Sequence, residues 1–227
     1  MGGLLYKNLL LYRVELILVA VFQLVISGTV LLNCLSGMAS RMAHLLLYGA
    51  LLLMTGFMES GLFAPDEKPA ARCFLISTPA GAKGHIASKY LMLLFVNLGI
   101  LVCCFLTDLG AVALTGDKDL MTGGMLIVLV GGNLLMEAIS LPFIVYFGSK
   151  YGMNAKGTAL GLLLLLGLVY VLFGDISHFL REDFLEALGK LLDRELRLAM
   201  PFVGGLAFWL SYRLSTALFR KGSENYD

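Results

Sequence analysis

The feature that most limits how this chain can fold is a series of long apolar segments spread along its whole length. Six windows hold about 20 mainly apolar residues each, the length that an α-helix needs to cross the hydrocarbon core of a bilayer. They cover Leu16–Leu35, Ala43–Phe63, Tyr90–Leu114, Gly124–Phe147, Gly157–Phe173 and Met200–Phe219. Charged residues, glycine or proline separate them. The pattern predicts an all-α integral membrane protein, a single domain over residues 1–227 with six transmembrane helices.

The composition indicates that lipid surrounds these helices. Of the 227 residues, 59% are hydrophobic and 15% are charged, whereas soluble domains are about 45–50% apolar and about 25% charged. The formal net charge is +1, and no basic patch with interleaved aromatic residues suggests a nucleic-acid partner. The four cysteines form no CxxC pair, so we expect neither a disulfide framework nor a metal site.

Lysine and arginine in the loops predict the orientation, because cytoplasmic loops are enriched in both residues. One side of the membrane collects Lys7, Arg13, Lys68, Arg72, Lys83, Lys89, Lys150, Lys156, Arg213, Arg220 and Lys221. Both chain termini fall on this side, so we expect both to be cytoplasmic. Arg213 lies inside the last window, and we expect its long side chain to extend to the nearer membrane interface.

Three segments outside the windows are informative. Residues 1–14 predict either an interfacial helix on the cytoplasmic leaflet or a simple extension of the first span. Residues 64–89 form a long cytoplasmic loop, whose mixture of charged and apolar residues predicts a short amphipathic helix. Residues 175–199 have apolar positions at three- and four-residue steps, which predicts an outer amphipathic helix. That helix would either cap an exit path or pack structurally.

Sequence motifs for catalysis are missing. The Gly81–Gly84 and Gly116–Lys118 stretches lack the spacing of a phosphate-binding loop, and no hydrolase or zinc-protease motif occurs. We therefore predict no catalytic residue, no metal and no cofactor on this chain.

Three acidic residues fall inside the apolar windows: Glu59, Asp108 and Glu137. A carboxylate in lipid is costly, so such residues usually face the protein interior or water. They could line a path for a cationic or amphipathic cargo. Alternatively, they could hydrogen-bond to neighbouring polar residues such as Asn97, Asn133 and Ser140.

Glycine doublets lie in two of the windows, Gly131-Gly132 and Gly204-Gly205. Small residues let membrane helices approach closely, so the doublets predict helix packing. Pro142 should kink the fourth helix before Gly148 ends it.

The loop between the second and third windows resembles that of ABC-2 type transporter permeases, particularly a compact six-helix bacterial group. The residues that carry the resemblance are Phe63, Asp66, Glu67, Lys68, Arg72, Ser77, Pro79, Lys89 and Tyr90. A second match is Leu141-Pro142-Phe143, followed by Phe147-Gly148 and Lys150. The chain departs from the pattern at residues 82–85, which affects the subfamily and not the family.

The resemblance implies an exporter permease in a bacterial cell membrane. Two permease chains, expected to form a homodimer, would join two separate ATPase subunits that hold ATP and magnesium. The loop would be a coupling helix that docks on the ATPase through Asp66, Glu67, Lys68, Arg72 and Phe74. The cargo in this group is often an amphipathic or antimicrobial peptide, or another amphiphile.

Two other functions are compatible with the sequence. The first is a non-transporting immunity or sensor protein that binds an amphipathic peptide at the outer surface through residues 176–198. The second is a secondary transporter that relays protons through the three intramembrane acids. Neither would need a partner ATPase.

Overall fold

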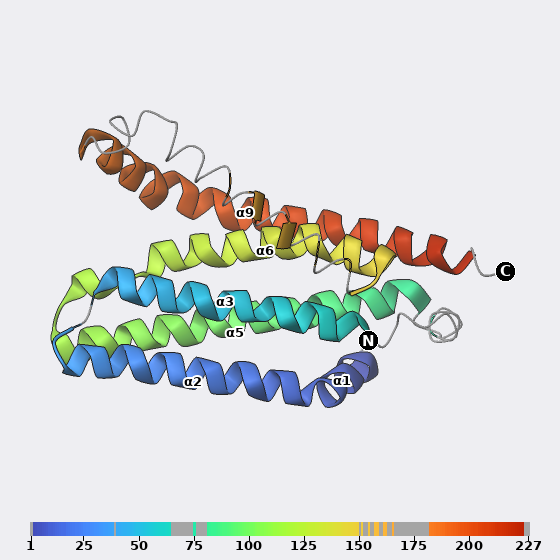
Figure 1. Ribbon diagram of the computed structural model, residues 1–227, viewed down its shortest axis with the longest axis horizontal. Coiled ribbons are helices and arrows are strands. Elements are labelled where there is room, and N and C mark those ends of the chain that lie inside the picture. The colour runs from blue at the N-terminus through green and yellow to red at the C-terminus, as the bar shows by residue number, and fades with distance from the viewer. Residues whose placement is uncertain are drawn as a thin grey trace.

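The computed structural model of the chain describes residues 2–38, 40–64, 75, 81–149, 151, 154, 157, 158, 161, 162, 165 and 182–224. Five of its helices contain a stretch long and apolar enough to cross a membrane: α2 (Arg13–Leu35), α3 (Arg41–Phe63), α5 (Gly81–Thr115), α6 (Gly123–Phe147) and α9 (Glu182–Glu224). They run side by side along the long axis of the molecule (Figure 1). The prediction of an all-α membrane protein is confirmed. Most of the predicted fifth span, 157–173, lies outside the described residues.

The two ends of the bundle differ. Helix α1 (Gly2–Leu11) and the C-terminal end of α9 lie at one end, which we call the terminal end (Figure 1). The α2–α3 turn and the α5–α6 turn, which contains the short 3₁₀ helix η2 (Lys118–Leu120), lie at the opposite end. Tyr12 breaks the chain between α1 and α2 with φ −104° and ψ 21°, so α1 is a separate helix that lies across the bundle. Its position at a membrane surface stays a prediction.

The side chains follow the pattern of a membrane protein. Tyr48, Leu51 and Leu93 are fully buried between the helices. Large apolar side chains also cover the outside of the bundle, where Leu24 is 72% exposed. In water such a surface would be unfavourable, but against lipid it costs nothing.

Helix α5 begins at Gly81, nine residues before the predicted start of the third span. Residues 81–89 were expected in the cytoplasmic loop because they contain Lys83 and Lys89. Gly81 has a φ of +56°, a left-handed conformation that glycine adopts readily, and the helix follows directly. Lys89 is buried against α3 with its charge bonded, so it does not end the span.

Helix α6 ends where the sequence predicts. Gly148 has a φ of +92°, and its N–H donates to the carbonyl of Ile144. Helices α6 and α9 approach so closely that a Cβ on Gly204 would lie 2.7 Å from the Gly131 carbonyl oxygen. The glycines at 131 and 204 thus allow the backbone contact that the doublets predict.

Helix α9 differs from the expected division into an outer helix and a separate span. It is one helix of 43 residues with Pro201 inside it. A proline removes only one helical hydrogen bond, and the leucines, alanine and methionine before it favour a helix. A helix of this length spans about 65 Å, more than the bilayer thickness of about 40–45 Å. How residues 182–198 lie relative to the membrane stays a prediction.

Candidate functional site

A fully buried carboxylate lies near the middle of α6. Glu137 has no solvent exposure, and side chains from three helices surround its two oxygens. Asn97 Nδ2 on α5 lies 2.9 and 3.1 Å from Oε1 and Oε2, respectively. Asn133 Nδ2 and Thr55 Oγ1 lie 3.0 and 3.1 Å from Oε1. Burial of this carboxylate is possible because it accepts several hydrogen bonds.

These residues also contact one another, and we call them the Glu137 cluster (Thr55, Asn97, Asn133 and Glu137). Asn133 Nδ2 lies 2.8 Å from Asn97 Oδ1 and 2.9 Å from Thr55 Oγ1. The cluster joins α3, α5 and α6 at one level of the bundle. In a medium of low dielectric constant, each of these bonds is strong and the loss of a partner is costly.

Glu59 forms a second polar contact between α3 and α6. It lies one turn after Thr55 in α3 and is fully buried. The hydroxyl of Ser140, also buried, donates to Glu59 Oε2. The contact therefore extends the joint made by the Glu137 cluster by about one helical turn.

Asp108 lies near the opposite end of the bundle and has different partners. The hydroxyl of Tyr48 on α3 donates to Oδ1 at 2.7 Å. The backbone N–H of Thr122 donates to Oδ2 at 2.9 Å, and the Thr122 hydroxyl donates to the same oxygen. His44 Nδ1 lies 3.8 Å from Oδ1. Asp108 thus holds the start of α6, immediately after the α5–α6 turn, against α3 and α5.

At the terminal end, a buried lysine joins the two helices that flank residues 65–80. Lys89 of α5 is 1% exposed, and its Nζ donates to the carbonyl of Leu62, one residue before the end of α3. Its ammonium also lies 4.4 Å from the centre of the Phe63 ring. The hydroxyl of Tyr12 donates to the same Leu62 carbonyl at 2.9 Å. We call Tyr12, Leu62, Phe63 and Lys89 the Lys89 clamp.

Two further contacts attach α1 and α9 to α5. Asn8 Nδ2 of α1 donates to the hydroxyl of Ser88 at 2.9 Å. The hydroxyl of Tyr90 lies 2.8 Å from Ser211 Oγ and 2.7 Å from Ser215 Oγ on α9. Helix α5 is therefore bonded through side chains to α1, α3, α6 and α9.

The predicted site residues fall into two groups. The candidate coupling residues Asp66, Glu67, Lys68, Arg72 and Phe74 lie outside the described residues. Glu59, Asp108 and Glu137 are all fully buried. The structure does not bring the three acids together. Asp108 lies near the C-terminal end of α5, whereas Glu137 contacts Asn97 in the middle of the same helix. Asn97, Asn133 and Ser140 donate as the structural interpretation expects, which favours that interpretation. A role in lining a path stays a prediction.

Several residues of these contacts could not be selected from the sequence. Lys89 was counted among the loop charges, Tyr90 marked the start of the third window and both belonged to the family resemblance, but nothing indicated what they bind. Tyr12, Tyr48 and Asn8 carry no motif. The available signal was a polar atom in an otherwise apolar helix, which shows that a partner is needed without showing which one.

The fold and these contacts define a polytopic helical membrane protein whose bundle is held together by buried polar side chains. The family model described as ABC-2 family transporter protein matches residues 3–220 of the chain. The chain therefore belongs to the ABC-2 transporter family, as its membrane-spanning permease component. Neither the search of curated proteins nor the search of solved structures found a match.

Proposed function

We propose that this permease works in an ATP-driven exporter of amphipathic peptides or related amphiphiles. Two copies of the chain would form the translocation path, and two separate ATPase subunits would supply the energy. Membership of the ABC-2 family supports the permease role. The sequence contains no phosphate-binding loop, which supports a separate ATPase that holds ATP and magnesium. We expect a bacterial cell membrane as the location, with both termini cytoplasmic.

The Lys89 clamp is the observation that carries the proposal. Residues 65–80, which hold the candidate coupling residues, connect the end of α3 to the start of α5. The clamp bonds Lys89 of α5 to Leu62 of α3 close to both ends of this connection. A displacement of residues 65–80 by an ATPase would therefore move α3 and α5 as one unit.

The movement would continue through the bundle by direct contacts. The Glu137 cluster joins α3 and α5 to α6. The contact between Gly131 and Gly204 joins α6 to α9. Tightly packed helices joined in this way move as a rigid body. The arrangement suits a permease that changes between inward-open and outward-open states.

Reconstitution with an ATPase tests the proposal. The full chain is co-expressed with the ABC ATPase with which it co-purifies and placed in proteoliposomes. We expect ATP hydrolysis that a cationic amphipathic peptide stimulates. The double variant Asp66→Ala/Glu67→Ala should lose this stimulation, whereas Lys118→Gln, an exposed lysine at the opposite end, should keep it. A chain that binds peptide equally well with and without any ATPase, and never transports it, would contradict the proposal.

The same vesicles separate the other functions. Peptide transport that survives removal of ATP and stops when the proton gradient collapses would indicate a secondary transporter. Protection against the peptide that depends on residues 176–198, and not on any ATPase, would indicate an immunity or sensor protein. In the first case, Glu59, Asp108 and Glu137 would be the groups to examine.

A further inference from the structure

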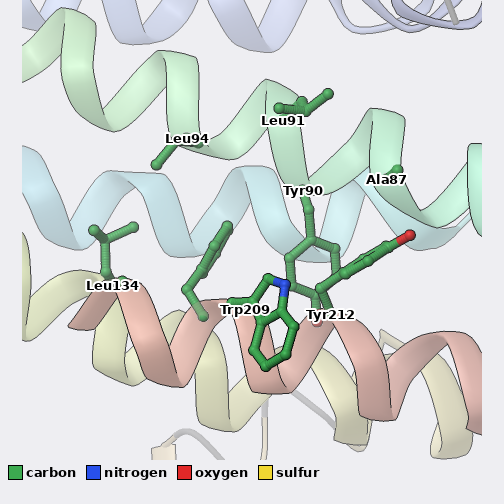
Figure 2. A pocket seen from close by; sticks show the side chains of 9 residues that line it. Ala87, Tyr90, Leu91, Leu94, Leu134, Trp209 and Tyr212 are labelled. Atoms are coloured by element: carbon green, nitrogen blue, oxygen red, sulfur yellow. The ribbon is translucent and has the colours of Figure 1, made fainter. Parts of the chain in front are cut away.

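An apolar groove lies between α5 and α9 on the outside of the bundle. It has a volume of about 400 Å³ and is lined by residues of α5, α6 and α9. Figure 2 shows Tyr90, Trp209 and Tyr212 gathered at one part of it, with Leu94 and Leu134 farther along. Volumes of this size accommodate small ligands, and the apolar lining selects a hydrocarbon group.

One exposed cation lies at the aromatic part of the groove, and a second lies one helical turn before the first α5 residue that lines it. Arg213 is exposed, and its guanidinium carbon lies 5.0 Å from the ring of Trp209, which lines the groove. The guanidinium thus lies back over the preceding turn of α9, and its extension to the membrane interface stays a prediction. Lys83 is also exposed, one helical turn before Ala87, which lines the groove from α5.

No acidic residue is close in sequence to either cation. Residues 81–98 of α5 and 199–220 of α9 contain no aspartate or glutamate. Arg213 therefore lies on an exposed, apolar surface of α9, where a charge without a nearby anion is unfavourable inside a membrane. An anion from outside the chain would offset that cost.

The dimensions agree with one leaflet of a bilayer. From Ala87 to Leu94 the groove follows α5 for about 10 Å, compared with about 15 Å for half of the hydrocarbon core. Tryptophan and tyrosine favour the level of the lipid headgroups. The cations and the aromatic rings therefore lie toward the headgroups, and Leu94 and Leu134 lie toward the bilayer centre.

We propose that this groove is a binding site for one anionic phospholipid of the surrounding bilayer. One acyl chain lies in the groove along Leu94 and Leu134. The phosphate group lies between Lys83 and Arg213, with the Arg213 guanidinium held over Trp209. Charge complementarity selects this occupant, because an apolar helix of a second copy would leave both cations without an anion. The site does not depend on the proposed export function.

The test compares two lipids that have the same acyl chains and differ in headgroup charge. The purified full chain is delipidated and titrated with phosphatidylglycerol and with phosphatidylcholine of the same acyl chains, and binding is counted by native mass spectrometry. Phosphatidylglycerol should bind more tightly. Arg213→Gln should weaken it about tenfold, the effect of losing one charged hydrogen bond, and weaken phosphatidylcholine less, because the choline cation already offsets the charge of its phosphate. Arg213→Lys should keep part of the preference.

Groove-filling variants test where the chain of the lipid lies. Gly205 lines the groove, and a Cβ there would meet no atom within 4 Å. Gly205→Leu should therefore fold and weaken the binding of both lipids. The matched control is Gly49→Leu, because Gly49 lines an aliphatic groove between α3 and α6 and is equally unobstructed. It should leave phosphatidylglycerol affinity unchanged.

Several outcomes would overturn the proposal. One is an unchanged preference for phosphatidylglycerol in Arg213→Gln. Another is an equal loss of affinity in Gly205→Leu and Gly49→Leu. A shift of Gly205→Leu from dimer to monomer, with lipid affinity retained, would assign the groove to a second copy of the chain. Loss of thermal stability in Gly205→Leu with lipid affinity retained would assign it to another segment of the same chain.

Discussion

The two faces of α6 use opposite chemistry to hold their neighbours. One face presents Asn133, Glu137 and Ser140, which hydrogen-bond across to α3 and α5. The other face presents Gly131, whose backbone touches the backbone of α9. The contact with α3 and α5 depends on polar side chains. The contact with α9 depends on the absence of a side chain at Gly131 and Gly204.

The difference reflects the solvent. In a bilayer, apolar side chains gain little by leaving lipid, so helix contacts depend on hydrogen bonds or on close backbone approach. Helix α6 uses one of these on each face, which makes it a link between α9 on one side and α3 and α5 on the other. The two joints fail in different ways, and the following variants separate them.

The largest expected effect is at the glycine joint. In Gly204→Ala the new methyl group would lie 2.7 Å from the Gly131 carbonyl oxygen, and neither backbone can move without separating the helices. We expect a loss of about 3 kcal/mol or more in the free energy of unfolding. Unfolding in mixed detergent micelles measures it. Gly132→Ala, with no atom within 4 Å of the added Cβ, is the control and should be neutral or stabilising.

The next effect is at the polar joint. Glu137→Leu would leave the donors of buried Asn97 and partly buried Asn133 beside an apolar side chain. We expect a loss of about 2–3 kcal/mol, since each buried unsatisfied donor costs about 1–3 kcal/mol and the asparagines can partly bond each other. Ile139→Ala, on the exposed surface of the same helix, should change stability by less. Equal losses in the two variants would show that the cluster contributes nothing.

A smaller and more specific effect is expected for Glu137→Gln. The amide keeps one acceptor oxygen, so we expect a loss of about 1 kcal/mol in stability. If the carboxylate also lines the cargo path, export of cationic peptides should fall more than export of neutral ones. Vesicles loaded with matched peptides measure this ratio. An equal fall in the export of both peptides would show that Glu137 has a structural role only.

The smallest effect is expected at the second α3–α6 contact. Ser140→Ala removes the hydroxyl that donates to Glu59, and we expect a loss of about 1 kcal/mol. Combined with Thr55→Val, the loss should exceed the sum of the single losses, because both residues join the same two helices. A strictly additive pair would show that the two contacts act independently.

The helices were predictable because their signal is local. Lipid requires about 20 apolar residues in succession, and the ends of α3 and α6 follow from the composition alone. The glycine joint was also predictable, since Gly131-Gly132 and Gly204-Gly205 are visible in the sequence. The start of α5 was not, because Lys89 was counted as a charge outside the membrane. Its burial depends on the Leu62 carbonyl, 27 positions away.

The partners of the buried polar residues were only partly predictable. Asn97 and Asn133 were named as alternatives because they lie in the same apolar windows as the acids. The bonds of Asp108 to Tyr48 and Thr122 depend on how α3 meets the α5–α6 turn, which no local pattern encodes. Two helices were expected in place of α9 because the composition changes near residue 199. The change costs the helix only one hydrogen bond, at Pro201, so α9 is continuous.

The central claim is that the Lys89 clamp transmits the work of an ATPase from residues 65–80 to the bundle, and Lys89→Met tests it most directly. The variant keeps the apolar stem and removes the ammonium that bonds the Leu62 carbonyl. The measurement is peptide transported per ATP hydrolysed, in proteoliposomes that contain the full chain and its ATPase. We predict that hydrolysis continues while transport per ATP falls at least about tenfold, the effect of losing one charged hydrogen bond. Transport per ATP equal to that of the unmodified chain, with the ATPase still bound, would contradict the account.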